Sequence, residues 1–476
     1  MTLIAVAEPI VAHATETATS ASSPAWRIVG AVDDPPLRDV LEQVLQRNPE
    51  LQAMRSRIEA WRSRPDQVGS LPDPMLHSTV FALPPETRVG PQRLQLGLSQ
   101  RIPSKVRRQL RRDEASLTVR AAEANMQATE LRLVTQAREL WLELAFFDTL
   151  HDILRDERGH LERHEEAARA RYAAGTGLAQ GPIKIQAQLT RIDTEILDID
   201  ARRQGLRARL DAVRDWPSDP EAMPDAGKRF SLSSVDATLT DLDLERLRST
   251  ALIRIALHTR PEMEAANARR DQAQLGQELA ESNRRPEFNF GLSWTLVEGR
   301  QDDVGRSQPP EDDGRDVLAF TGGMTLPLWR TARRAELTEA LARIDAAGAD
   351  ARREAAEIRR QTSDLAHRLP FEIRQLELLR DVLERQAEEA VTSVVSAYST
   401  GQTGALDLLD AEHRLFEVRR DVARARADVA IALARLEGAL ATPLAELRLE
   451  NAAHERSSAT QPASDTLGSA EVKTGW

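Results

Sequence analysis

Four short segments of the chain alternate apolar and polar residues with the period of two that is typical of β-strands. In the clearest, Glu287 to Leu296, every even-numbered position is apolar. Its partner runs from Val317 to Leu326, and an earlier pair runs from Met75 to Leu83 and from Arg93 to Ile102. Strands of about ten residues with one apolar and one polar face suit a membrane barrel, whose wall meets lipid outside and a polar lumen inside. Four strands are too few to close a barrel, since about eight is the smallest number that packs. The chain must therefore pool its strands with copies of itself or use them in another sheet.

The long stretches after each strand pair follow the helical period instead. Residues 103–172 contain no internal proline, and we expect one very long helix there. The matching stretch, 327–398, has Pro370 as its only internal proline, where we expect a kink. Shorter helices, 183–213 and 406–440, should return after sharp turns.

Short motifs recur in the same order in both halves of the chain, which indicates an internal duplication. The recurring pairs are Asn48-Pro49-Glu50-Leu51 with Arg260-Pro261-Glu262-Met263, Ile102-Pro103 with Leu326-Pro327, and Tyr172-Ala173-Ala174-Gly175 with Tyr398-Ser399-Thr400-Gly401. Each half thus reads helix, strand, strand, long helix, helix, with β-hairpins at 75–102 and 287–327. The predicted fold class is mainly α with a transmembrane β portion, built from this duplicated unit.

The predicted domain organisation follows from the repeats. The first repeat covers 37–214 and the second 242–445, joined by a linker at 215–241 that is rich in proline. Residues 1–36 are interpreted as a flexible N-terminus that holds the remnant of an export signal, because a mildly apolar run ends in Ala-His-Ala but lacks a basic start. A flexible tail without any signal is the alternative there. We expect a disordered C-terminal tail at 446–476, which is rich in Ser, Thr and Ala.

Composition supports long helices and excludes several classes of function. Aromatic residues make up 4% of the chain and charged residues 29%, as in coiled coils. The net charge of −11 comes from intermixed acidic and basic residues without a basic stripe, which gives nucleic-acid binding no support. Cysteine is absent, so disulfides and cysteine metal sites are excluded. No phosphate-binding loop, nucleophile elbow or zinc-protease motif occurs, and we expect a protein that is not an enzyme and has no cofactor.

The order of elements, the duplication and the Tyr-x-x-Gly turns resemble the TolC-like outer-membrane efflux family, across roughly residues 37–445. Leu71 to Leu76, before the first strand, and Leu98 to Pro103, around the end of the second, resemble more narrowly the heavy-metal branch of the CzcC and CusC type. The resemblance implies a homotrimer in the bacterial outer membrane, in which three chains form one 12-stranded β-barrel and a helical tunnel through the periplasm.

The resemblance also implies a function and partners. It predicts the outer-membrane channel of a tripartite efflux pump that works with a periplasmic adaptor (membrane fusion) protein and an inner-membrane RND-type pump. The barrel would contact outer-membrane lipid. The expected substrates are heavy-metal cations, and efflux of drugs or other small molecules is the alternative. A periplasmic adaptor or a coiled-coil scaffold without a pore also stays open.

Two carboxylates just after the second turn are the candidate gate. Asp407 and Asp410 lie three positions apart, so they share a helix face near its N-terminus. They could simply complement the helix dipole. In the resembled family, Asp residues at these positions ring the closed periplasmic end, and Tyr398 matches a tyrosine of the turn. A tyrosine that only anchors the helix end is the alternative for Tyr398. The family's arginine after the turn glycine is Thr403 here, so a charged lock of that design is lacking.

The two predicted turns are the candidate docking tips for the adaptor. Their residues are Gly175, Thr176, Gly177, Gly401, Gln402, Thr403 and Gly404. Glycine there allows a helix to end in a left-handed cap.

The spacing of the histidines in the sequence does not predict a metal site. The nine are scattered, and only His160 and His164 stand one helical turn apart. Because the surrounding segment is highly charged, we interpret both as solvated surface residues and expect no metal site.

Overall fold

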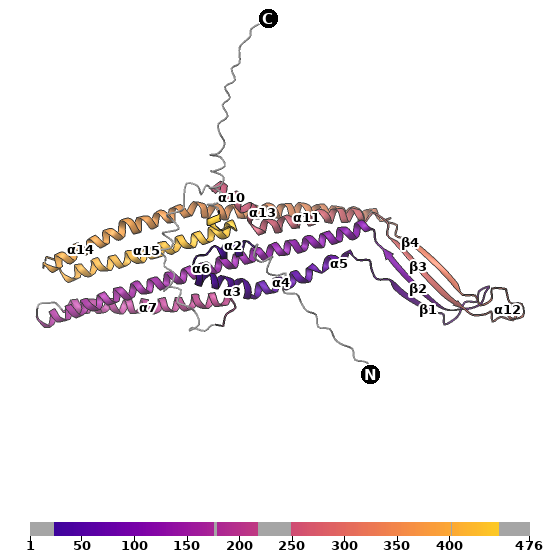
Figure 1. Cartoon of the computed structure of the whole chain (residues 1–476), viewed down its shortest axis with the longest axis horizontal. Helices are drawn as coiled ribbons and strands as arrows, with labels where there is room; N and C mark the ends of the chain where they lie inside the picture. The colour runs from indigo at the N-terminus through magenta and orange to yellow at the C-terminus, as the bar shows by residue number, and fades with distance from the viewer. Residues whose placement is uncertain (1–22, 176–178, 218–248, 401, 447–476) are drawn as a thin grey trace, which may run out of the picture. The chain divides into compact units, whose positions relative to one another are not determined.

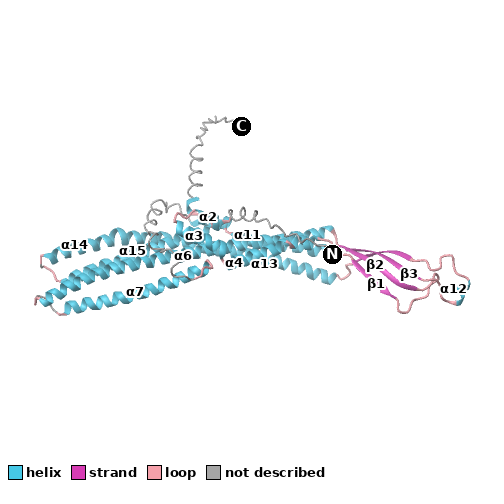
Figure 2. Cartoon of the chain, turned by 60° about the horizontal axis from the view of Figure 1, so that its bottom comes forward, coloured by secondary structure: helices cyan, strands magenta, loops and turns pink. Residues whose placement is uncertain are grey.

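The computed structural model describes residues 23–175, 179–217, 249–400 and 402–446. In this part of the chain, long helices accompany one four-stranded antiparallel sheet (Figure 1, Figure 2). None of the described helices combines the length and the apolar character needed to cross a bilayer. The predicted fold class, mainly helical with a duplicated unit and a small β portion, is confirmed.

Two compact units make up the chain, and each draws residues from both repeats. We call them the hairpin unit, Met1–Gln52 with Gln127–Pro261 and Ala356–Trp476, and the sheet unit, Ala53–Met126 with Glu262–Ala355. The duplication therefore does not produce two separate domains. Instead, equivalent parts of the repeats pack together.

The sheet unit brings both strand pairs into a single sheet. The strands are β1 (Met75–Val80), β2 (Gln92–Ile102), β3 (Phe288–Val297) and β4 (Val317–Met324), in the order β1-β2-β3-β4. The central pair joins the repeats, with Leu98 opposite Leu292 and Gln95 opposite Thr295. β1 ends before the expected Leu83, because Pro84 and Pro85 follow and cannot donate hydrogen bonds to a neighbouring strand.

One face of this sheet is apolar and open, and the other is polar. Across all four strands, one apolar row consists of Leu76, Leu98, Leu292 and Phe320. All four side chains are exposed, and Phe320 reaches 81%. On the opposite face, Ser293 is only 8% exposed. The alternation predicted from the sequence is thus present, with the apolar side turned outward.

Several helices connect to the strands within the sheet unit. They are α5 (Arg64–Gly69), most of α4 (Pro49–Arg62) and α11 (Pro261–Ser282), the start of α6 (Lys105–Ala173) and the start of α13 (Arg330–Glu377), with α12 (Asp303–Ser307) in the β3–β4 loop.

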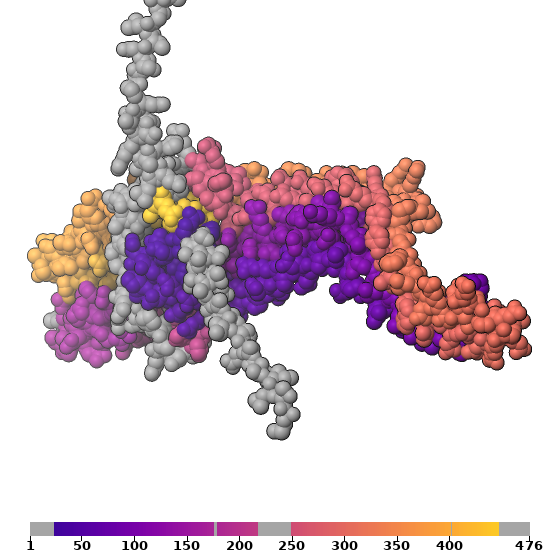
Figure 3. Space-filling view, turned by 45° about the vertical axis from the view of Figure 1, so that its right-hand side comes forward, coloured from indigo at the N-terminus to yellow at the C-terminus, as the bar shows by residue number. Residues whose placement is uncertain are grey.

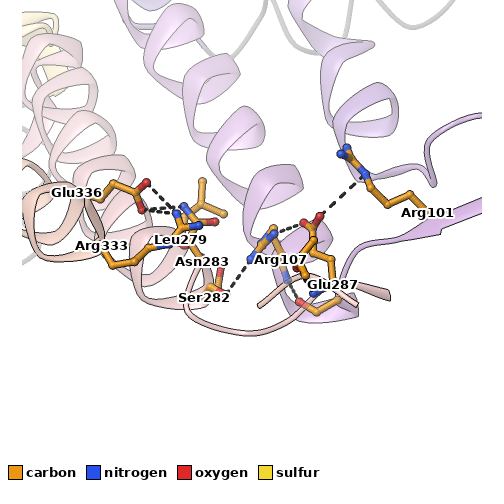
Figure 4. A network of polar contacts seen from close by, with 10 residues as sticks. Arg101, Arg107, Leu279, Ser282, Asn283, Glu287, Arg333 and Glu336 are labelled. Carbon is orange, nitrogen blue, oxygen red and sulfur yellow. Dashed lines mark hydrogen bonds and ion pairs between the residues drawn. The ribbon is translucent and has the colours of Figure 1, made fainter. Parts of the chain in front are cut away.

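An ionic network fixes the junction between helices and strands (Figure 4). Arg107, at the start of α6, is buried and forms an ion pair with Glu287, just before β3. The same guanidinium donates a hydrogen bond to the Ser282 carbonyl at the end of α11 (2.9 Å). Nearby, Arg333 pairs with Glu336 at 2.9 Å. Removing one partner of a buried pair is costly, so Arg107 holds the two repeats together where the strands begin.

The hairpin unit contains the two helical hairpins and the N-terminal helices. Its elements are the rest of α6, α7 (Gln180–Val213), α10 (Ser249–Thr259), the end of α13, η2 (Leu378–Glu384), α14 (Arg385–Ser399), α15 (Ala405–Leu440), α2 (Pro24–Gly30) and α3 (Pro35–Arg47). Apolar side chains such as Trp141, Leu154, Ile192 and Leu436 are fully or almost fully buried. Apart from η2 and α14, which contain no buried residue, these helices follow the ordinary rule of apolar residues inside.

One expectation needs correction here. We expected a flexible N-terminus through residue 36, but Pro24–Gly30 forms α2, and Ile28 and Val29 are buried. Arg27 donates a hydrogen bond to the Ala441 carbonyl (3.4 Å), so α2 lies against the end of α15 (Figure 3). The burial of this short apolar stretch is the physical reason why it forms a helix and is not flexible.

The proline of the long helix lies within α13, which continues through Pro370 without interruption. The π-helix η2 follows a few residues later. Residues 1–22, most of the expected linker (218–241) and the tail from 447 onward lie outside the described residues.

Candidate functional site

The tip of the first hairpin ends in a left-handed glycine. Gly175 has φ +71°, and its N–H donates a hydrogen bond to the Tyr172 carbonyl (3.0 Å). A left-handed residue after a helix is the usual position of a capping glycine. The neighbouring tip residues Thr176 and Gly177 lie outside the described residues.

The second tip leads directly into α15. The Gln402 N–H donates to the Ala397 carbonyl (2.9 Å), and the Thr403 hydroxyl donates to the Gly404 carbonyl (3.3 Å). Gly404 has extended backbone angles, and its N–H donates to Oδ2 of Asp407 (3.1 Å). Gly401 is outside the described residues. Asp407 therefore caps the helix, as a carboxylate near a helix N-terminus is favoured to do.

Asp410 lies one turn further along α15 and is strongly exposed, at 73% of its side chain. Its only described ionic neighbour is Arg414, at 3.9 Å on the same helix. An exposed pair at this distance contributes little energy. The Asp410 carboxylate thus remains available to solvent or to another molecule, whatever Asp407 does for the helix.

Tyr398 connects the two hairpins. It is half-buried at the end of α14, and the guanidinium of Arg171, at the end of α6, lies 4.7 Å from the centre of its ring. A cation over an aromatic face at this distance is attractive, by about 0.5–1 kcal/mol at exposed sites. Tyr398 therefore brings the end of α14 into contact with the end of α6 in the first repeat.

A cavity of about 210 Å³ lies between the same hairpins. α15 contributes Leu406, Leu409 and Asp410 to its lining, and the first hairpin contributes Glu157 and Lys184. Asp410 thus belongs to a space that both repeats enclose.

A buried carboxylate ties α6 to α15 beside this cavity. Glu157 is 3% exposed and forms an ion pair with Arg420, which also lies 3.4 Å from Glu195. A second ion pair joins Glu157 Oε1 to Nδ1 of His413 (2.9 Å). No local sequence pattern predicts this network, because its partners are more than 200 positions apart.

Three potential metal ligands come together next to the network. His164 Nε2 lies 2.7 Å from Oε2 of Glu412, and His160 Nδ1 lies 3.7 Å from Oε1 of the same carboxylate. The His164 side chain is 24% exposed and hydrogen-bonds to Glu412, unlike the solvated residue that we expected, whereas the His160 side chain is 43% exposed. Burial opposes ionisation of the Glu412 carboxyl, but the hydrogen bond and charge of His164, aided by His160, outweigh it and hold its pKa below its usual value.

A polar groove of about 720 Å³ runs along α14 toward the second tip. Its lining includes Glu388, Thr392, Ser396 and Gln402. It lies beside the tip where we expected a partner to dock.

Comparison with known proteins links the chain to outer-membrane channels. Residues 252–442 match the model of a family described as "Outer membrane efflux protein". No curated protein sequence matches the chain.

Several solved structures share the fold over most of its length. The outer membrane protein VceC of Vibrio cholerae is 19% identical, with a TM-score of 0.68, covering 88% of this chain and 99% of its own. The open-state MtrE outer membrane channel of Neisseria gonorrhoeae is 20% identical, with a TM-score of 0.65, covering 86% and 90%. CusC, described in terms of transmembrane channel formation, is 13% identical, with a TM-score of 0.67, covering 88% and 97%.

These findings confirm the resemblance to the TolC-like outer-membrane efflux family, through the family match in the second repeat and the shared fold. The similar structures include outer-membrane channels.

Proposed function

We propose that this TolC-like chain is the outer-membrane channel component of a tripartite RND-type efflux pump, through which substrate passes from the periplasm to the exterior. The observation that carries the proposal is the sheet with its apolar row exposed on one face and polar residues on the other, where Ser293 and Thr295 of β3 are buried. In water, such a contiguous apolar patch would be unfavourable. In lipid, the same arrangement is the one that a membrane strand needs.

The unpaired edges of the sheet support assembly of several copies. β1 and β4 form its two edges in the described part of the chain. Edge N–H and C=O groups have no partner in lipid, so a stable assembly must pair them. Four strands per chain are too few for closure, and three copies supply the 12-stranded barrel that the family resemblance implies.

The second hairpin supports the same stoichiometry. Neither η2 nor α14 contains a buried residue, although α14 separates apolar and polar residues along its length. Leu378, Val382 and Val395 are exposed. Contact with helices of another copy would cover these side chains, as in a helical tunnel through the periplasm.

Asp407, Asp410 and Tyr398 form the proposed gate. Threefold symmetry would place six carboxylates around one axis, where they favour cations over anions. The double variant Asp407→Asn with Asp410→Asn should raise the resting conductance of the channel in planar bilayers. Asp421→Asn, an exposed carboxylate further along α15, is the matched control and should leave conductance unchanged. A double variant that stays as closed as the parent would reject the gate.

The hairpin tips and the groove along α14 form the proposed docking site for the periplasmic adaptor. Thr392→Trp would fill the groove and should weaken adaptor binding, whereas Thr190→Trp, on the exposed face of α7, should not. Gly175→Pro and Gly401→Pro should disturb the tips themselves. Adaptor pull-down that is unchanged in all of the groove and tip variants would exclude this surface.

Heavy-metal cations are the proposed substrate class, on the strength of the branch resemblance at Leu71 to Leu76 and Leu98 to Pro103. The fold does not separate this branch from others, since identity is 13% to CusC and 19–20% to VceC and MtrE. Deleting the gene and testing growth on a panel of metals and drugs distinguishes the classes. Sensitivity to metals alone supports metal export, sensitivity to drugs alone supports the alternative, and complementation by the intact chain is the control.

A further inference from the structure

The three residues His160, His164 and Glu412 have the composition and spacing of a metal site. Their ligand atoms all lie within 4.8 Å of one another. The two histidines stand one turn apart on α6, and the carboxylate comes from α15 of the other repeat. Two histidines and one carboxylate with an open fourth position are a known zinc ligand set.

The existing geometry is close to what an ion requires. Ligand atoms of tetrahedral zinc lie about 3.3 Å apart, given bonds of about 2.0–2.1 Å. Oε2 of Glu412 lies 2.7 Å from Nε2 of His164, and its other oxygen, Oε1, lies 3.7 Å from Nδ1 of His160. The ligand atoms of all three residues lie within 4.8 Å of one another. Small rotations of the side chains would therefore replace the direct hydrogen bond by coordination to an ion.

Packing holds two of the ligands in place. The ring of His160 lies edge-on against Phe416, with ring centres 5.4 Å apart and an angle of 72°. Phe416 is buried, so this contact limits the orientations of the imidazole. The Glu412 side chain is only 14% exposed. A ligand set that is oriented before binding loses less conformational entropy when the ion arrives.

The surroundings of the three residues give water access to the site and leave a local charge that favours a cation. His160 and Glu412 line the cavity of about 210 Å³, which gives water a route to an open coordination position. Lys184 brings a positive charge to the cavity, and Glu157 and Asp410 bring negative ones. Arg420 neutralises Glu157, so Asp410 offsets Lys184 and the Glu412 carboxylate remains to attract a cation.

We propose that His160, His164 and Glu412 bind a first-row divalent transition-metal ion, with Zn²⁺ as the best match, and that the bound ion links α6 of the first hairpin to α15 of the second. The site goes beyond the proposed channel function, because it is made within one chain and requires neither the pump nor the adaptor. Imidazole and carboxylate ligands together favour such ions over Mg²⁺ or Ca²⁺.

The test is a titration of the purified full-length chain, without a polyhistidine tag, by Zn²⁺ in competition with a chromophoric chelator. We expect one tight site per chain. His160→Gln, His164→Gln and Glu412→Gln keep side-chain size and polarity, and each should weaken binding by at least about tenfold, since even supporting residues of metal sites cost that much.

His413→Gln is the matched control. His413 lies on α15 near the site, but carboxylates occupy both of its ring nitrogens, Glu157 at 2.9 Å and Glu417 at 3.3 Å. The His413→Gln variant should bind Zn²⁺ with an affinity within about twofold of that of the parent, because His413 is not one of the proposed ligands. Unchanged affinity in all three ligand variants, or an equal loss in His413→Gln, would overturn the assignment.

A thermal measurement provides a second readout. Zn²⁺ should raise the midpoint of thermal unfolding of the parent and of His413→Gln, because a ligand that binds only the folded chain stabilises it. It should leave the midpoint of His164→Gln unchanged. An equal shift in both variants would contradict the proposal. Failure of the conductance or growth experiments would not affect either readout, so the metal site and the proposed channel function are tested independently.

Discussion

The sheet and the helical hairpins of this chain bury opposite kinds of side chain. In the sheet, Leu98 and Phe320 are exposed while Ser293 is buried. In the hairpins, Leu154 and Ile192 are buried while charged residues such as Asp198 and Arg202 are exposed. Both patterns come from the same amino acids and the same preference for a matching environment. Under the proposed function, this difference arises because the two regions face different solvents, lipid around the sheet and water around the hairpins.

The largest expected effect tests the burial of apolar side chains in the helical hairpins. Leu154→Ala removes a fully buried side chain from α6 and should lower the free energy of unfolding by about 3–5 kcal/mol. Leu197→Ala on α7, 70% exposed, should change it by less than about 0.5 kcal/mol. Guanidinium unfolding of the purified chain in detergent measures both, and similar losses would show that the hairpins do not pack as described.

The exposed apolar face of the sheet is tested by placing a charge on either face of β2. Leu98→Arg puts a cation on the outward apolar row and should destabilise the protein in lipid by about 2–4 kcal/mol. Gln95→Arg, three positions away on the polar face, should be tolerated. The readout is the amount of folded protein recovered from outer membranes or lipid vesicles. If Gln95→Arg is as damaging as Leu98→Arg, the apolar face does not meet lipid.

A smaller effect concerns the tip of the first hairpin. Gly175→Ala should cost about 1–2 kcal/mol, because a Cβ at φ +71° is strained even though no atom lies within 4 Å of it. Gly181→Ala, inside α7 and with only an ordinary contact to Ala168, should cause no loss. Thermal unfolding compares the two, and equal stability would place Gly175 outside the left-handed region.

The smallest effect depends on pH. The pKa of Glu412 is lowered in the folded chain, so its stabilising contribution is present above the unfolded value of 4.5 and is lost as pH falls through the lower folded value. Compared with Glu412→Gln, the parent should be more stable by about 1 kcal/mol at pH 6, and the difference should shrink as the pH falls below the unfolded pKa of Glu412. A difference that grows on acidification would contradict the assigned ion pair.

Local periodicity explains why so much of the fold could be predicted. Strand alternation located β1 to β4 within a few residues, and the absence of proline located α6. η2 was missed, since a single π-helical segment has no sequence period. α2 was missed because a seven-residue helix depends on burial against distant residues rather than on its own pattern.

The candidate site was less predictable for a related reason. Asp407 could be found because capping is local, and the structure shows its hydrogen bond to Gly404. The partner of His164 is Glu412, 248 positions away, and only the packing of one repeat on the other brings them together. Sequence spacing alone therefore made His164 look like a surface residue.

The assembly of the sheet with copies of itself is the central claim, and disulfide formation between edge strands tests it most directly. The chain has no cysteine, so Ser78→Cys on β1 can be combined with single cysteines at each position from Val317 to Met324 on β4. Within one chain, β1 and β4 are three strand spacings apart, about 14 Å, too far for a disulfide.

In outer membranes, we predict that at least one of these pairs gives covalent dimers and trimers on non-reducing gels, with a ladder that stops at three chains. Monomers alone at every position, or a ladder that continues beyond three, would contradict the account.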